Sequence, residues 1–166
     1  TNGELVLEAG GKMYSCSCAA GPALEGMNIT SGMRAAKGAV EDVHIGPEGI
    51  RLDVIGGDEP HGLCGSGILA VVRELVRNGL VTRRGAFAKP EDFEVGDYRR
   101  DILRYNGTKR EALLYSSGET ELLVTQSDVR QVQLAKGEIR SGIEVLLSHG
   151  GLTYEDIDKV LIAGQF

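Results

Sequence analysis

The sequence predicts an α/β fold with a mixed sheet, and three observations support this. A glycine-rich stretch at residues 62–67 leads into a pattern typical of an amphipathic helix. A second and longer helical pattern begins near residue 126. Around both helices lie short segments that alternate apolar and polar residues and are joined by glycine turns, as in β-hairpins. Helices that follow strands in this way pack as a layer on a sheet.

Length and composition restrict the class of protein. The 166 residues can bury one core or two small lobes, and 42% hydrophobic with 25% charged residues is typical of a globular protein. A net charge of −6 argues against a nucleic-acid surface, and no apolar run approaches the roughly 18–20 residues of a membrane span. Three cysteines, an odd number, favour a reduced cytoplasmic protein. The chain starts without a methionine and stops after a strand-like run, so we expect a piece of a longer protein.

The first helix is expected at residues 68–78, directly after the glycine loop. Its apolar residues fall on one face, and Arg73, Glu74 and Arg77 are expected on the other. Ser66 is placed to cap the helix start, and Asn78-Gly79 is a helix stop. A glycine loop at a helix N-terminus favours an anion such as phosphate. The alternative is that these glycines only let the helix pack close to a sheet.

Elsewhere the sequence predicts two hairpins, three further short strands and two irregular regions. Residues 4–8 and 12–17 alternate around a glycine turn, and so do residues 43–45 and 50–54. Three further short strands and two irregular stretches complete this part of the chain: strands at 102–105, 112–115 and 121–124, and loops at 27–36 and 82–96.

The longest helix is expected from a capping box at residues 125–128 to about residue 148. Its predicted buried stripe is Val132, Ala135, Ile139, Gly142, Ile143 and Leu146. Gly137 and Gly142 each cost about 1 kcal/mol against alanine inside a helix, so we expect both to face a close neighbour. Lys136 and Arg140 form either a positive edge beside a nucleotide or, with Glu144, a salt-bridged solvent face.

Two further expectations concern the chain end and the cysteines. The apolar run at residues 159–163 is suited to a strand that is buried on both faces. Cys16, Cys18 and Cys64 with His61 offer the ligand set of a Cys₃His zinc site. Their spacing lacks the usual Cys-x-x-Cys pattern, so three reduced thiols are the preferred interpretation.

The order of these pieces resembles a known superfamily. Thr1-Asn2-Gly3 before a hairpin, Cys18-Ala19-Ala20-Gly21 after it, and a final run at residues 160–164 resemble the second lobe of actin, sugar kinases, heat-shock chaperones and the activators of 2-hydroxyacyl-CoA dehydratases. The resemblance implies an actin-like, ribonuclease H-like ATPase lobe with a mixed sheet, β-hairpins and a long packing helix. In that superfamily an Asp-x-Gly turn holds the nucleotide phosphates, and a strand that ends in glycines lies against the adenosine.

Five motifs in order resemble one branch more closely, the ATP-dependent reductive activators of corrinoid proteins. They are Thr1-Asn2-Gly3-Glu4, Ser17-Cys18-Ala19-Ala20-Gly21-Pro22-Ala23, Gly62-Leu63-Cys64-Gly65-Ser66-Gly67, Thr125-Gln126 and Gln133-Leu134-Ala135-Lys136. The resemblance implies ATP and Mg²⁺ as cofactors, a corrinoid protein as partner, and return of its Co(II) to Co(I). It also implies a two-iron, two-sulfur cluster in an N-terminal ferredoxin-like domain, which with the first ATPase lobe lies outside this chain. Residues 1–166 are then a single domain fragment, and a homodimer is compatible with this scheme.

The resemblance and the glycine loop together give a set of nucleotide-binding candidates. Thr1-Asn2-Gly3 resembles the end of the phosphate turn, and residues 162–166 resemble the start of the adenosine motif, although a second glycine is more usual at Gln165. The full set is Thr1, Asn2, Gly3, Gly65, Ser66, Gly67, Lys136, Arg140, Ala163, Gly164 and Gln165. No catalytic or metal-binding residue is assigned, because the Mg²⁺-directing aspartate of the family precedes this motif. The alternative function is a non-catalytic docking or dimerisation lobe that binds the corrinoid protein.

Overall fold

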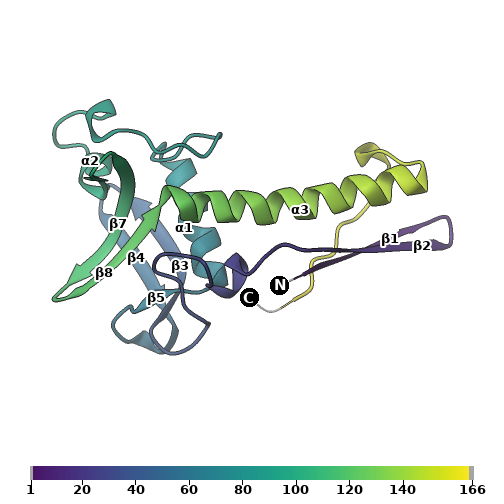
Figure 1. The fold of residues 1–166 in the computed structure, drawn as a ribbon, viewed down its shortest axis with the longest axis horizontal. Helices are drawn as coiled ribbons and strands as arrows, with labels where there is room; N and C mark the ends of the chain where they lie inside the picture. The colour runs from purple at the N-terminus through teal and green to yellow at the C-terminus, as the bar shows by residue number, and fades with distance from the viewer. Residues whose placement is uncertain (1, 165–166) are drawn as a thin grey trace. The chain divides into compact units, whose positions relative to one another are not determined.

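The computed structural model describes residues 2–164, and the chain divides into two compact units (Figure 1). The terminal unit consists of residues 2–21 and 134–164, and the central unit consists of residues 22–133. Helix α3 (Gln126–Gly150) contributes its first residues to the central unit and the rest to the terminal unit. Each unit is described by itself below.

The central unit contains two three-stranded sheets. In the first, β3 (Ala39–Gly46) lies between β4 (Gly49–Val54), with which it is antiparallel, and β5 (Gly62–Leu63), with which it is parallel. In the second, β7 (Lys109–Ser117) lies between β6 (Leu103–Asn106) and β8 (Thr120–Thr125), and both pairs are antiparallel. The predicted mixed sheet and the predicted hairpin of residues 43–54 are confirmed.

Helix α1 (Gly65–Arg77) packs its apolar face on β3. Ile68, Val71 and Leu75 are completely buried, as the helical spacing predicts. The other helices of this unit are short: the 3-10 turns η1 (Ala23–Glu25), η2 (Ile55–Gly57) and η3 (Pro90–Asp92), and α2 (Tyr98–Ile102). Residues 82–96 are irregular apart from η3, as expected, whereas α2 was not predicted.

The two ends of α1 differ in how well the sequence predicted them. At the C-terminus, Asn78 Nδ2 donates to the carbonyl oxygens of Glu74 and Ile45, and Gly79 takes a left-handed conformation with φ of 71°. At the N-terminus the predicted cap is wrong: the helix begins at Gly65, so the cap position is Cys64 and Ser66 lies inside the first turn. A serine inside the first turn cannot serve as the N-cap, because its hydroxyl does not reach the free N–H groups at the helix start.

Helix α3 begins at the predicted capping box. Asp128 Oδ2 accepts from Thr125 N at 2.7 Å, and Asp128 N donates to Thr125 Oγ1 at 3.3 Å. The buried Asp128 carboxylate also accepts from Thr30 N at 2.8 Å, which ties the loop at residues 27–36 to the helix start. A cap that holds a second segment explains why this loop is ordered without regular secondary structure.

The terminal unit is a β-hairpin on the remainder of α3. The hairpin is β1 (Gly3–Ala9) with β2 (Lys12–Cys18), antiparallel and joined at Gly10-Gly11, as predicted. The chain then leaves α3 through Gly151 and the 3-10 turn η4 (Tyr154–Asp156). Of the predicted stripe, Ala135, Gly142 and Leu146 are buried here, and Ile139 and Ile143 are half-buried.

The two helix glycines behave differently. A Cβ at Gly142 would lie 2.2 Å from Cys18 Sγ and 2.7 Å from Leu5 Cδ1, so the hairpin approaches the helix as closely as glycine allows. The same expectation is wrong for Gly137, because apart from the helix's own neighbouring backbone no atom of the described chain lies within 4 Å of the position of its Cβ. Gly137 is exposed, and the helix carries its cost without a packing gain at that residue.

The predicted buried strand at residues 159–163 is also wrong. Residues 157–164 have no regular secondary structure, and Val160, Leu161 and Ile162 are 74%, 83% and 88% exposed. A strand buried on both faces needs partners at its edges and cover on its faces. Within residues 2–164 this segment has neither strand partners nor cover on its faces, so its apolar side chains are exposed.

The contrast between the two helix glycines gives a matched test of stability. We expect Gly142→Ala to lower the free energy of unfolding by about 1–3 kcal/mol, because the added methyl group overlaps Cys18 Sγ. Gly137→Ala should instead raise it by up to about 1 kcal/mol, because the position is open and alanine favours the helix. Urea unfolding followed by circular dichroism measures both. Equal effects of the two substitutions would contradict the close approach at Gly142.

Asp97 provides a pH test of the start of α2. Its carboxylate accepts from the Arg99 side chain and from Arg99 N at 2.9 Å, and these bonds lower the pKa of Asp97 from 3.8 to about 2. Because the folded pKa lies below the unfolded one, the stabilisation is complete above pH 3.8 and is lost as the pH falls through about 2. Carboxyl NMR titration should therefore give a midpoint near 2. A midpoint near 3.8 would contradict the Arg99 contact.

Candidate functional site

The nucleotide-binding candidates are distributed over both units. Asn2, Gly3, Lys136, Arg140, Ala163 and Gly164 belong to the terminal unit, and Gly65, Ser66 and Gly67 belong to the central unit. Thr1 and Gln165 lie outside the described residues. The two groups have different local chemistry, and they are taken in turn.

In the terminal unit, the start of β1 lies against the middle of α3. Gly3 pairs with Cys18 in the hairpin, and its Cβ position lies 3.2 Å from Ile139 Cγ1. Lys136 precedes Ile139 by three residues and therefore lies on the same side of the helix. The exposed Asn2 and the exposed Lys136 are thus brought to one end of the hairpin. Backbone N–H groups beside a lysine are a suitable environment for phosphate.

Arg140 has partners of its own on α3. Its Nε lies 2.9 Å from Glu144 Oε1, and its guanidinium stacks 4.6 Å from the ring centroid of Tyr154. The Tyr154 hydroxyl donates to the same Glu144 oxygen at 2.8 Å. Hydrogen bonds from Tyr154 and Arg140 lower the pKa of Glu144, and the hydrogen bond to Glu144 raises the pKa of Arg140. The salt-bridged alternative therefore describes Arg140 well.

This cluster of Arg140, Glu144 and Tyr154 also fixes η4 on the helix. The turn has its own capping box, in which Asp156 Oδ2 accepts from Thr153 N and Oγ1, each at 2.8 Å. Tyr154 was not among the candidates. The sequence signal for Tyr154 was its position in an otherwise polar turn, because an aromatic ring in such a turn is expected to pack on an apolar surface or a cation. Ala163 and Gly164 follow in the exposed segment that leaves this turn.

In the central unit the glycine loop has a clear packing role. A Cβ at Gly65 would lie 2.0 Å from the carbonyl oxygen of Leu24, and one at Gly67 would lie 2.1 Å from that of Val40. Both glycines are therefore needed for α1 to approach η1 and β3. Ser66 Oγ lies 3.3 Å from Cys64 Sγ. The alternative interpretation of the loop, close packing on a sheet, thus has direct support from these distances.

The charge around this helix start does not favour phosphate. A shallow hollow beside α1 is lined by Ser66, Arg73 and three carboxylates, those of Glu41, Asp42 and Asp53. Asp42 accepts from Val43 N at 2.8 Å and from Arg73 at 3.0 Å, and these contacts lower its pKa. The one lining arginine is thus already paired with a carboxylate. A dianionic ligand would meet net negative charge here.

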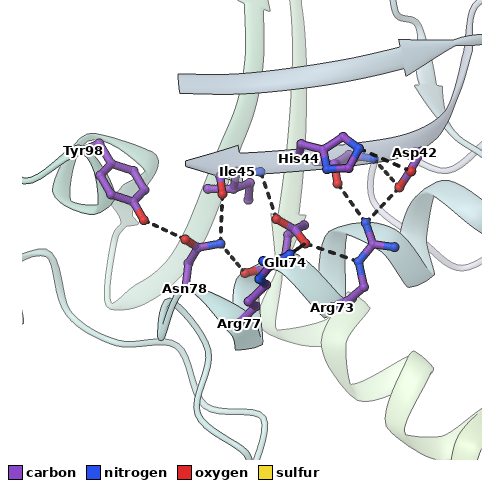
Figure 2. A network of polar contacts seen from close by, with 9 residues as sticks. Asp42, His44, Ile45, Arg73, Glu74, Arg77, Asn78 and Tyr98 are labelled. Carbon is purple, nitrogen blue, oxygen red and sulfur yellow. Dashed lines mark hydrogen bonds and ion pairs between the residues drawn. The ribbon is translucent and has the colours of Figure 1, made fainter. Parts of the chain in front are cut away.

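Figure 2 shows that this arginine belongs to a polar network between α1 and β3. Its centre is Glu74, which is 3% exposed and accepts from Ile45 N at 3.1 Å, with Arg73 Nε at 3.3 Å. The expectation that Glu74 lies on the solvent face is therefore wrong. The Ile45 N–H on β3 holds the Glu74 carboxylate in the interior, while the side chains of its partners Arg73 and Arg77 remain largely exposed.

In the part of the chain that the structure describes, no cysteine belongs to a converging group of three metal-ligating side chains. Cys64 Sγ donates to the carbonyl oxygen of Val40 at 3.2 Å in the central unit, whereas Cys16 and Cys18 belong to the terminal unit. Among residues 2–164, the one group of three metal-ligating side chains with converging atoms is Asp42, His44 and Asp53. All three cysteines are free thiols.

Comparison with known proteins identifies the family. The model of the C-terminal domain of RACo, the ASKHA domain, matches residues 1–166. The chain belongs to this family. The actin-like fold and the resemblance inferred from the five motifs are thereby confirmed.

Two curated relatives and one solved structure agree with this assignment. The chain is 37% identical over 170 residues to the corrinoid activation enzyme RamQ of Eubacterium limosum, covering 100% of the chain and 29% of that protein. It is 28% identical over 188 residues to the [Co(II) methylated amine-specific corrinoid protein] reductase of Methanosarcina barkeri, covering 99% of the chain and 30% of that protein. The structure of a reductive activator for corrinoid, iron-sulfur protein superposes with a TM-score of 0.82 at 32% identity, covering 96% of the chain and 25% of that protein.

The chain thus spans less than a third of these relatives. No helix in residues 2–164 has the length and apolar character needed to cross a membrane.

The Glu74 network makes a stability prediction. Glu74→Ala should lower the free energy of unfolding by about 1–3 kcal/mol, because it leaves the Ile45 N–H without its acceptor. Arg77→Ala is the matched control: the arginine is 77% exposed, so its loss should change stability by about 0.5 kcal/mol or less. Urea unfolding of the two variants tests this, and a neutral Glu74→Ala would show that the carboxylate does not hold β3.

Proposed function

We propose that the chain is the nucleotide-binding region of an ATP-dependent reductive activator, which returns a corrinoid protein from Co(II) to Co(I). The observation that carries the proposal is the match of the whole chain to the ASKHA domain of RACo. The relatives add to it, because each is named for activation or reduction of a corrinoid protein. The corrinoid protein is accordingly the proposed partner, and a homodimer is a compatible assembly.

Asn2-Gly3 and Lys136 are the residues of the terminal unit best suited to nucleotide phosphates. A glycine turn offers backbone N–H groups without side-chain bulk, and a lysine adds a positive charge. The ATP that the family implies would supply the free energy for an unfavourable electron transfer. These residues would bind and orient its phosphates, with Gly3 held in register by Cys18 and Ile139. Ala163 and Gly164 are the proposed adenosine contacts.

The chain cannot supply every group that the proposed activity needs. Its three cysteines are fewer than the four thiolates that usually hold a two-iron, two-sulfur cluster, so the cluster belongs to another region of the activator. The described part of the proposed phosphate turn, Asn2-Gly3, carries no carboxylate for Mg²⁺. The ion would therefore be held through phosphate and by residues outside this turn.

The function is tested in an activator that contains this chain together with its iron–sulfur region. The absorbance change from Co(II) to Co(I) on a corrinoid protein is followed with and without ATP. We expect reduction to need ATP. Reduction that proceeds equally without ATP, together with tight corrinoid binding, would instead favour the docking or dimerisation lobe.

Lys136 is tested by nucleotide titration of the same activator. Lys136→Ala should weaken ATP binding about tenfold, the effect of losing one good phosphate contact of about 1.4 kcal/mol. Lys12→Ala, which removes the same charge at the turn of the hairpin, should leave the affinity unchanged. If both variants bind ATP equally well, Lys136 does not contact the nucleotide. The proposed function is then still decided by the ATP dependence of Co(II) reduction.

Arg140 needs a different comparison because it is already paired. If its guanidinium contacts nucleotide, Arg140→Ala should weaken ATP binding and Glu144→Ala should not. If Arg140 acts by holding the turn that leads to Ala163 and Gly164, both substitutions should weaken binding, because each removes one of the side chains that hold Tyr154 on the helix. The second outcome is the one we expect from the geometry, and unchanged affinity in both variants would exclude either role.

The isolated 166-residue chain should bind ATP no better than about millimolar, equivalent to about −4 kcal/mol. It should also show little or no ATP turnover. An actin-like ATPase closes its site between two lobes, and loss of even one preorganised donor typically costs about 10²–10³ in rate. Isothermal titration and a phosphate-release assay measure both quantities. Turnover by the chain alone near that of the complete activator would contradict the incomplete site.

A further inference from the structure

We propose that Cys16 and Cys18 are a redox-active thiol pair that closes to a disulfide by exchange with a small-molecule disulfide. No step of the proposed nucleotide or corrinoid chemistry uses these thiols. They are separated by one residue on β2, so their side chains leave the same face of the strand. That face is the one that packs on α3 at Gly142.

The two sulfur atoms share one small space. The Cβ position of Gly142 lies 2.2 Å from Cys18 Sγ and 3.3 Å from Cys16 Sγ. Cys16 Sγ also lies 3.7 Å from the carbonyl oxygen of Gly142, to which it donates. The thiols are therefore held side by side by the helix rather than turned apart. No third metal-ligating group of the described chain converges with them, which leaves a dithiol rather than a closed metal site.

The strand geometry determines what kind of disulfide this pair can form. Residues i and i+2 of an extended strand are about 6.6 Å apart at Cα, and disulfides span about 4.4–6.8 Å. The pair thus lies at the long end of the allowed range, and closure favours a shortened β2. Strained disulfides are easily reduced, which is the property of regulatory rather than structural bridges.

The two thiols differ in access, and this sets the order of events. Cys16 is half-buried, whereas Cys18 is 7% exposed. Burial and the hydrogen bond with Cys16 raise the pKa of Cys18, which disfavours its thiolate, and the more exposed Cys16 is the one that a small disulfide can reach first. The Cys16 thiolate attacks the small disulfide, forms a mixed disulfide and releases one small thiol. Cys18 then loses its proton and attacks Cys16 Sγ, and the second small thiol leaves with that proton. Two protein thiols are oxidised and one small disulfide is reduced to two thiols.

The bridge would act on one end of the hairpin. Cys18 pairs with Gly3 and Cys16 with Leu5, while the pairs from Val6–Ser15 to Ala9–Lys12 lie beyond the bridge. Shortening β2 between residues 16 and 18 therefore loosens the start of β1 and leaves the turn end paired. Asn2-Gly3 is the proposed phosphate turn, so oxidation should weaken nucleotide binding. This regulatory role rests on the proposed function, whereas formation of the disulfide does not.

The first experiment incubates the chain with oxidised glutathione, blocks remaining thiols by alkylation and determines peptide masses. We expect the peptide that contains Cys16 and Cys18 to lose the mass of two hydrogen atoms and to resist alkylation, and Cys64 to be alkylated. Cys18→Ser should stop at a glutathione adduct on Cys16, and Cys64→Ser should behave as the parent chain. A lasting adduct on Cys16 in the parent chain, or no reaction at all, would overturn the thiol pair.

The second experiment compares amide hydrogen exchange in the reduced and oxidised chain. Exchange at Gly3 and Leu5 should become faster on oxidation and return on reduction, with little change at the turn end of the hairpin. Unchanged exchange after the bridge has formed would overturn the effect on β1. ATP titration of the complete activator in both redox states then tests regulation separately. Equal affinities would remove the regulatory role, while the disulfide and the ATP-dependent activity are judged by their own assays.

Discussion

The structure depends on helices that approach their neighbours more closely than any residue but glycine allows. Gly65 and Gly67 bring α1 to the carbonyl oxygens of Leu24 and Val40, and Gly142 brings α3 to the thiols of β2. In each case a Cβ would lie between 2.0 and 2.2 Å from a heavy atom, well inside van der Waals contact. Glycine inside a helix costs about 1 kcal/mol, and close packing with neighbouring backbone and side chains offsets it. Where that packing is missing, as at Gly137, the cost is not offset by contacts.

In the terminal unit this constraint connects packing with function. A two-stranded hairpin alone is at best marginally stable in water, so β1 and β2 depend on their contact with α3. The contact at Gly142 sets the distance between hairpin and helix, and the hairpin register then places Gly3 beside Ile139. Lys136 lies one turn earlier on the same side. The proposed phosphate contacts are thus positioned by a packing interaction less than two helical turns away, which contains the thiol pair.

Local features of the fold could be read from the sequence, and non-local ones could not. The hairpins, both helices and the capping box at Thr125 and Asp128 were predicted because alternation, turn residues and capping act within a few residues. The Ser66 cap failed because the close approach of Gly65 moves the helix start back to that residue. The burial of Glu74 depends on an N–H from β3, 29 residues away in sequence. The run at residues 159–163 has strand composition, but pairing partners are not encoded in composition.

In the candidate site, too, the sequence pattern does not show what surrounds a glycine loop in the fold. The charges around each loop in the structure supply that information. Glycine loops at a helix start look alike in sequence whether they bind an anion or allow close packing. In the central unit, the surrounding carboxylates and the paired Arg73 favour the packing interpretation of the loop at Gly65 and Gly67. In the terminal unit, the glycine at the start of β1 packs against Ile139 of α3, and the exposed Lys136 lies one helical turn before Ile139. A phosphate group needs both accessible N–H groups and a favourable potential, so the start of β1 is the better of the two positions.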